Sequence, residues 1–179
     1  HAGISRTFQK IRLFRDLTVL ENVAAALYPP RVPSRLPGLW TGRVLGHSSA
    51  MLPRAMQLLA TVGLAERRDD LARNLSYGEQ RMLEIARALA TRPRLILLDE
   101  PAAGLSAVDV EFLRGVITRI QRSGIAILLV DHHTTFLMSV VHRIVVLNQG
   151  RVIFDGPPAA ARRDPGVIKA YLGAAAHAA

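Results

Sequence analysis

The 179-residue chain contains no cysteine, and its only lysines are Lys10 and Lys169. The absence of cysteine excludes a disulfide framework and any thiolate-bound metal site. The apolar runs are too short to cross a bilayer, and the first residues lack the apolar core of a signal peptide. No G-x-x-x-x-G-K-[ST] segment occurs, so the chain lacks the usual loop that cradles phosphates.

The composition that remains is that of a globular protein. Half of the residues are hydrophobic and 21% are charged, which is enough to build a core. The formal charge of +9 comes almost wholly from arginine, and the basic residues are scattered along the chain. Because aromatic residues make up only 5%, stacking platforms for nucleic acid are not indicated, and we expect no nucleic-acid partner.

The first half of the chain is predicted to be mainly helical. Residues 4–9 alternate like a short strand, and Thr18 with Glu21 forms the pattern that begins a helix. Apolar spacing predicts another helix over 51–62, and a further one follows Ser76. Between them, the proline- and glycine-rich stretch of residues 29–50 is predicted to be a surface loop.

The second half alternates between strands and helices. The apolar runs LILLD and IAILLV predict strands covered on both faces, with a helix between them over 108–123. A short helix over 134–141, a hairpin turning at 148–150 and a tail with one short helix complete the prediction. A strand–helix–strand order predicts parallel strands, which bind ligands at their carboxyl ends.

Four polar residues lie at or just past such strand ends: Gln9, Asp99, Glu100 and His132. A carboxylate such as that of Asp99 can hold Mg²⁺, which completes its shell with water and phosphate oxygens. Glu100 can polarise an attacking water, and His132 can donate a hydrogen bond to a γ-phosphate. The amide oxygen of Gln9 can also bind the metal.

The stretch Ser76-Tyr77-Gly78-Glu79 opens a helix, and helix N-termini attract phosphate. Each signal also has a purely structural interpretation. Ser76 and Glu79 match the S-x-x-E capping box that any helix can use. Asp99 and Glu100 can equally end a strand and cap the next helix. Only the combination of patterns, in this order, favours nucleotide chemistry.

Together these patterns resemble the ATP-binding-cassette (ABC) ATPases. LSYGEQRMLEIARAL is similar to the signature motif of that family, LILLDEP to its Walker B element and AAGLSAVD to its D-loop. LLVDHH resembles the switch-histidine loop, and RTFQ resembles the Q-loop. Three stretches resemble the ATP-binding subunits of branched-chain amino-acid importers: GISRTFQKIRLFRDLTVLENV, LDEPAAGLS and DPGVIKAYLG.

The resemblance implies an α/β fold: a P-loop-NTPase-like parallel sheet flanked by helices, with an inserted α-helical signature subdomain and a C-terminal β-hairpin. The N-terminal strands and P-loop of that fold would be absent. The expected domains are the end of the N-terminal core with the Q-loop, the helical subdomain, the α/β ATPase core and a C-terminal extension. Their limits are 1–14, 15–92, 93–156 and 157–179.

The resemblance also implies an ATPase with ATP and Mg²⁺ as cofactors. Glu100 and His132 would be catalytic, and Gln9 and Asp99 would hold the metal and nucleotide of their own subunit. Two subunits would pair head to tail in a dimer. The remaining nucleotide-binding residues would then face the ATP of the partner: Ser76, Gly78 and Glu79.

The implied function is that of the ATP-binding subunit of an importer for branched-chain or related amino acids. Its partners would be integral-membrane permease subunits, a second ATP-binding subunit and, indirectly, a solute-binding protein. It would lie peripherally on the cytoplasmic face of the bacterial inner membrane. The alternatives are a soluble ABC ATPase of DNA repair or translation, and a nonhydrolysing nucleotide-dependent docking module.

Some positions depart from the family pattern. Tyr77 stands where the family usually has Gly, and Glu79 where it usually has Gln. Ser106 replaces the common D-loop Asp, and His133 replaces the Asp that commonly follows the switch His. Because the chain starts with His1 and lacks the phosphate-cradling loop, we expect an N-terminally truncated chain. The complete protein would then hydrolyse MgATP, whereas these residues alone would bind it poorly.

Overall fold

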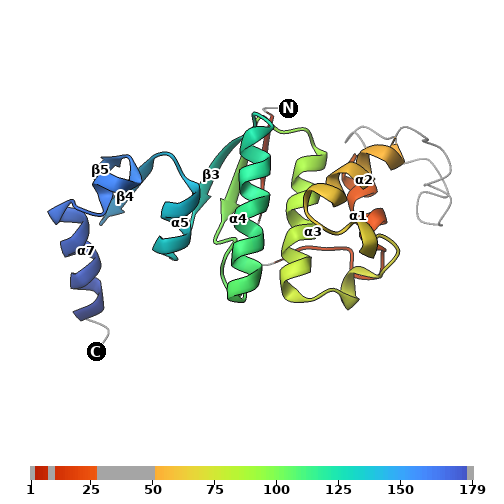
Figure 1. The fold of residues 1–179 in the computed structure, drawn as a ribbon, viewed down its shortest axis with the longest axis horizontal. Helices are drawn as coiled ribbons and strands as arrows, with labels where there is room; N and C mark the ends of the chain where they lie inside the picture. Colours follow the sequence, from red (N-terminus) through yellow and green to blue (C-terminus); the bar gives the residue numbers. More distant parts are fainter. Residues whose placement is uncertain (1–2, 8–10, 28–50, 177–179) are drawn as a thin grey trace. The chain divides into compact units, whose positions relative to one another are not determined.

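The computed structural model describes residues 3–7, 11–27 and 51–176. This part of the chain forms two compact units, His1–His132 and His133–Ala179. The first contains a parallel sheet with helices, and the second contains a hairpin with helices, as the ribbon in Figure 1 shows. The mixed α/β architecture predicted from the sequence is therefore confirmed. Among the described helices, none combines the length and apolar character needed to cross a membrane.

The sheet of the first unit has three parallel strands in the order β1-β2-β3: Ile4–Arg6, Leu95–Asp99 and Ala126–Val130. Their registers pair Arg6 with Leu97 and Asp99 with Val130. Since all three strands run the same way, Arg6, Asp99 and Val130 end at the same edge of the sheet. The edge predicted to carry functional residues is thus assembled from three separate parts of the chain.

Helix α4, Ala107–Arg122, connects β2 to β3 and lies across one face of the sheet in Figure 1. Ile96 and Leu98 are buried on this face, whereas Leu128 and Val130 are more than half exposed. The prediction of a strand covered on both faces is therefore wrong for β3 in the described part of the chain, whereas no residue of β2 is exposed. A continuous apolar run does not by itself distinguish a strand buried on one face from one buried on two.

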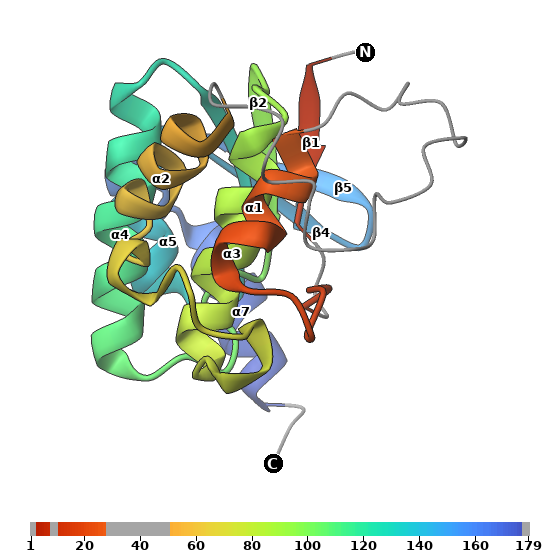
Figure 2. The same cartoon turned by 90° about the vertical axis from the view of Figure 1, so that its right-hand side faces the viewer.

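The helical part of the first unit consists of α1 (Val19–Leu27), α2 (Met51–Thr61) and α3 (Tyr77–Ala90), which contact one another. Figure 2 shows the three helices side by side. Two short 3₁₀ turns, η2 (Ala65–Arg67) and η3 (Ala72–Asn74), join α2 to α3. The core includes residues of the apolar stripes that the sequence spacing predicted, among them Val23, Leu59, Ile85 and Leu89.

The second unit contains α5 (Thr134–Val140), β4 (Ile144–Asn148), β5 (Arg151–Gly156), α6 (Pro158–Ala161) and α7 (Pro165–Ala176). Strands β4 and β5 pair in antiparallel fashion, and Gln149 and Gly150 between them have positive φ angles of 47° and 75°. The predicted hairpin is confirmed. The tail holds two helices, α6 and α7, where the sequence predicted one short helix.

Candidate functional site

Asp99 ends β2, and its carboxylate contacts a basic residue from the neighbouring strand. The Oδ2 atom accepts a hydrogen bond of 2.9 Å from Nη2 of Arg6, the last residue of β1. Both side chains are partly exposed, at 33% and 55%. A carboxylate has acceptor capacity on both oxygens, so the bond to Arg6 leaves Oδ1 able to bind a cation or a water.

Glu100 turns the chain sharply away from β2. It is one of three non-glycine residues with positive φ among those described, at 45°, a conformation that costs free energy in an L-residue. Its N–H donates to the carbonyl of Val130 over 2.8 Å, which ties this turn to the end of β3. Strained backbone that the neighbouring structure holds in place is typical of functional positions.

His132 lies two residues past β3 and faces Glu100. Its Nδ1 is 3.8 Å from Oε1 of Glu100. This distance is too long for a direct hydrogen bond, but it allows an ion pair when the histidine is protonated. The side chain of His132 is 63% exposed and that of Glu100 is 31% exposed. A reacting group at this edge could therefore reach both.

Asp131, beside His132, was not among the predicted site residues, yet its side chain is fully buried. Its Oδ2 accepts a hydrogen bond of 3.1 Å from the N–H of Ala102, in the turn that follows Glu100. A buried carboxylate is stable only when its acceptors are satisfied. Asp131 thus joins the end of β3 to the segment carrying Glu100.

The second group of predicted residues lies at the start of α3. Ser76 caps the helix: its Oγ accepts from the N–H of Glu79 at 3.2 Å, and the Glu79 Oε2 accepts from the N–H of Ser76 at 2.8 Å. The capping box predicted from the sequence is therefore present. Ser76 is exposed, and its hydroxyl keeps its proton for another acceptor. The first N–H groups of a helix also have no intrahelical partner, which favours an anionic ligand here.

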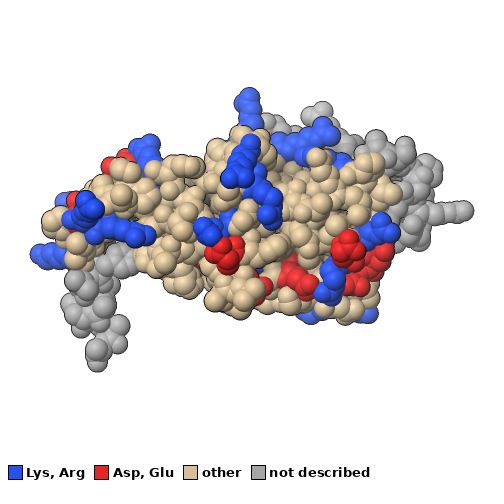
Figure 3. Space-filling view, viewed as in Figure 1, with Lys and Arg blue, Asp and Glu red and all other residues tan. Residues whose placement is uncertain are grey.

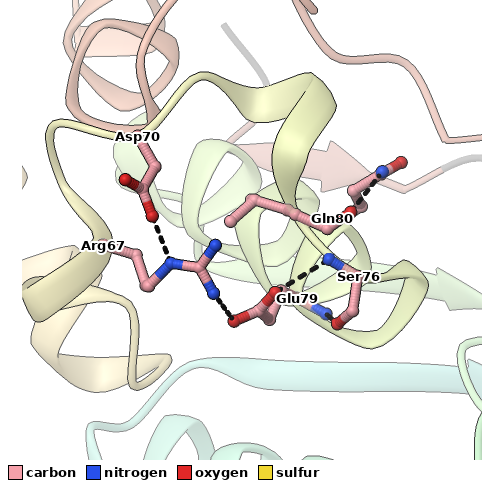
Figure 4. A network of polar contacts seen from close by, with 6 residues as sticks. Arg67, Asp70, Ser76, Glu79 and Gln80 are labelled. Carbon is pink, nitrogen blue, oxygen red and sulfur yellow. Dashed lines mark hydrogen bonds and ion pairs between the residues drawn. The ribbon is translucent and has the colours of Figure 1, made fainter.

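The carboxylate of Glu79 takes part in a wider network, drawn in Figure 4. Its Oε1 accepts a hydrogen bond of 2.6 Å from Nη1 of Arg67. The same arginine donates a second hydrogen bond, through Nε, to the carboxylate of Asp70. The pKa of Arg67 is raised, first by the hydrogen bond to Asp70 and next by the charge of Glu79. Both oxygens of Glu79 are thus engaged within its own subunit.

The start of α3 also touches the segment that follows Glu100. A Cβ on Gly78 would lie 2.7 Å from a carboxylate oxygen of Asp109, and a Cβ on Gly104 would lie 3.2 Å from the ring of Tyr77. Asp109 is fixed by Ser106, which caps α4 and donates its hydroxyl to Asp109 over 2.6 Å. Glycine at both positions lets these two stretches approach closely.

The described residues fit magnesium and a phosphate in part. Oδ1 of Asp99 can take Mg²⁺, Glu100 and His132 face the same edge, and Ser76 with Gly78 opens a helix N-terminus. Gln9, predicted to bind metal and nucleotide, lies outside the described residues. Arg6 adds a positive charge beside Asp99, so the Asp99 carboxylate would bind both Arg6 and the metal ion. The assignment of these residues to nucleotide and metal remains a prediction.

Sequence reasoning missed three residues of this region: Arg6, Arg67 and Asp131. Arg6 and Asp99 are 93 positions apart, and only the strand register brings them together. Arg67 and Glu79 are 12 positions apart and are separated by a 3₁₀ turn. The i, i+3 and i, i+4 spacing by which ion pairs on one helix are found therefore does not predict this pair. For Asp131, two signals were available: its place directly after an apolar strand, and two adjacent histidines, a pattern that suggests a metal site but is disfavoured as one because neighbouring residues on a strand point to opposite faces.

On the surface, charges are mixed. On the face drawn in Figure 3, basic side chains over the α3 and α4 region are interrupted by uncharged surface, with acidic side chains nearby. This distribution agrees with the scattering of the basic residues along the sequence.

Comparison with known proteins gives two family matches. Residues 1–103 match the family described as ABC transporter, and residues 151–177 match the one described as branched-chain amino acid ATP-binding cassette transporter. The chain is 40% identical over 175 residues to the high-affinity branched-chain amino acid transport ATP-binding protein BraF of Pseudomonas aeruginosa. It is 41% identical over 175 residues to LivG of Escherichia coli, which has the same description. Each alignment covers 97% of this chain and 69% of the relative.

Solved structures give the same result for the fold. The chain is similar to the ATP-binding cassette MJ1267 of an ABC transporter, with a TM-score of 0.77 and 26% identity. That alignment covers 94% of this chain and 68% of the other.

Proposed function

We propose a function on the premise that the chain belongs to the ABC transporter family, whose ATP-binding proteins are ATPases. Within that family, this chain is the ATP-binding subunit of an importer for branched-chain or related amino acids. One observation carries the choice of solute: residues 151–177 match a family specific to branched-chain amino-acid transporters. The identity of 40% to BraF, over 97% of this chain, supports it.

The site supports the following roles in ATP hydrolysis. MgATP, when bound, supplies the phosphoanhydride bond and the charge of the metal. Asp99 would hold the metal through the carboxylate oxygen that Arg6 leaves open, because Arg6 donates to Oδ2. Glu100 would accept a proton from the attacking water, and its backbone is tied to the end of β3 by the hydrogen bond to Val130. His132 donates a hydrogen bond to the phosphate oxygen on which charge develops.

The remaining binding residues act on the nucleotide of a second subunit. Ser76 is exposed at the start of α3 and can donate its hydroxyl outward, and Gly78, in the first turn of the helix, would offer its backbone N–H to the same phosphate. Gln9 belongs to the proposed metal site by its sequence resemblance. Two subunits would pair so that the Ser76 of each faces the Asp99 edge of the other.

ATP-binding subunits of transporters work with membrane permease components. We infer that this chain docks on such permeases at the cytoplasmic face of the inner membrane and receives solute through a binding protein. Copurification with two hydrophobic permease subunits, and ATP hydrolysis stimulated by leucine-loaded binding protein, would support the transport role. An ATP hydrolysis rate that is unchanged by the permeases but raised by DNA or ribosomes would contradict it.

The enzymatic part is tested with Glu100→Gln in the complete subunit. Removal of the general base should lower kcat by about 100-fold or more and leave ATP binding intact. Glu111→Gln is the matched control, because Glu111 is an exposed acid of α4 that pairs with Arg114. Turnover of Glu100→Gln at the control rate would exclude Glu100 as the general base, and background turnover in the unchanged subunit as well would favour a nonhydrolysing docking module.

A further inference from the structure

An acid in the first turn of α3 poses an electrostatic problem for the proposed phosphate site. The positive end of a helix dipole attracts a carboxylate as well as a phosphate. Glu79 lies in this first turn, three residues after Ser76. An uncompensated charge there would repel any phosphate that the Ser76 hydroxyl is to bind.

In the structure, both oxygens of the Glu79 carboxylate have hydrogen-bond donors. One oxygen of Glu79 accepts from the N–H of Ser76 at 2.8 Å, and the other accepts from Arg67 at 2.6 Å. Arg67 is itself held by Asp70, so its guanidinium is clamped between two acids, as Figure 4 shows. The carboxylate of Glu79 is thereby turned back onto its own helix and paired with a fixed cation.

We propose that Arg67 is a positioning residue for nucleotide binding: it neutralises Glu79 and holds the carboxylate against Ser76, so that the Ser76 hydroxyl can donate to an anionic phosphate. Arg67 acts through Glu79 and touches no ligand itself. Glu79 then supports Ser76 and does not contact the nucleotide. This inference rests on the proposed function, because it assumes that Ser76 meets a phosphate.

The test compares Arg67→Ala with the double variant Arg67→Ala/Glu79→Gln in the complete subunit, by measuring KM for ATP and kcat separately. Loss of Arg67 should raise KM about two- to fivefold, the effect of one partly exposed ion pair, and change kcat less. Adding Glu79→Gln should return KM to near its original value. Glutamine can still reach back to the Ser76 N–H, but it carries no charge.

Two controls separate electrostatics from folding. Arg68→Ala removes a neighbouring arginine whose partner is the exposed Asp69, and it should leave KM unchanged. The rise in KM for Arg67→Ala should also shrink between about 0.05 M and about 0.5 M salt, because salt screens exposed charges. A loss of packing alone would be neither rescued by Glu79→Gln nor reduced by salt.

The proposal is overturned if Arg67→Ala leaves KM unchanged, or if Glu79→Gln fails to restore it. A Ser76→Ala variant shows which premise is at fault. If Ser76→Ala lowers ATP turnover but Arg67→Ala has no effect, the positioning role fails and the proposed function stands. If Ser76→Ala also has no effect, the phosphate site at α3 fails as well.

Discussion

Replacement of Gly63 by alanine tests how the helical part of the first unit is fixed to α4. Gly63 follows α2 with a φ angle of 73°, and a Cβ built on it would lie 2.4 Å from Cζ of Phe112 in α4. Two further ring atoms would lie at 3.3 and 3.4 Å. The alanine must therefore adopt an unfavourable backbone conformation, and the ring must move away.

The two effects can be estimated separately. A left-handed alanine costs about 1–2 kcal/mol. Displacing the ring loses its contact with the guanidinium of Arg119, 5.8 Å from the ring centroid, which is worth about 0.5–1 kcal/mol at an exposed site. With some lost apolar contact, we expect Gly63→Ala to cost about 2–4 kcal/mol, or a fall in Tm of about 5–15 °C for a chain of this length.

Gly124→Ala is the matched control, because Gly124 has a φ of 83° and no atom within 4 Å of the added Cβ. It should cost only the backbone term, about 1–2 kcal/mol. Both variants are compared by urea unfolding followed by circular dichroism, and by thermal melting. In the Phe112→Ala background, Gly63→Ala should cost no more than Gly124→Ala, because the clash is gone. Equal costs for Gly63→Ala with and without the Phe112 ring would refute the reasoning.

Three further predictions follow from single contacts. Asp131→Ala leaves the Ala102 N–H without its buried acceptor and should cost about 1–3 kcal/mol in urea unfolding, whereas Asp131→Asn should cost less. Ser106→Ala removes the cap of α4 and should cost about 1 kcal/mol by the same measurement. Arg143 lowers the pKa of Asp155 through two hydrogen bonds, so the pair stabilises the folded state above the ordinary value of 3.8 and loses this effect as the pH falls below it. In Arg143→Ala, the free energy of unfolding should therefore fall less steeply as the pH is lowered. The measurement is the urea midpoint of unfolding between about pH 2 and about pH 6.

What the sequence predicted well was encoded locally. Thr18 and Glu21 begin α1 through a reciprocal cap, with hydrogen bonds of 2.7 and 3.1 Å, because both partners lie within one turn. The turn at Gln149-Gly150 is indicated by Gly150, which adopts its positive φ at little cost. Such signals need no knowledge of the rest of the fold, so they can be read directly from the residue pattern.

What the sequence did not predict depends on tertiary arrangement. Leu128 and Val130 belong to a continuous apolar run, yet they are exposed because, among the described residues, β3 is the last strand of its sheet and is covered on one face. The pairing of Arg6 with Asp99 depends on strand register, and the burial of Asp131 depends on a turn 29 residues earlier. No local pattern distinguishes these acids from other residues at strand ends.

The contacts around α4 connect the two groups of predicted functional residues within one subunit. Gly78 packs on Asp109, and Gly104 packs on Tyr77, so the start of α3 and the segment after Glu100 leave no room for a side chain between them. Asp131 fixes the beginning of that same segment through Ala102. Because Ser106 donates a hydrogen bond of 2.6 Å to the Asp109 carboxylate, a larger residue at position 78 would push this carboxylate away and break that bond. Packing inside the subunit therefore favours glycine at position 78, independently of any ligand that its backbone meets.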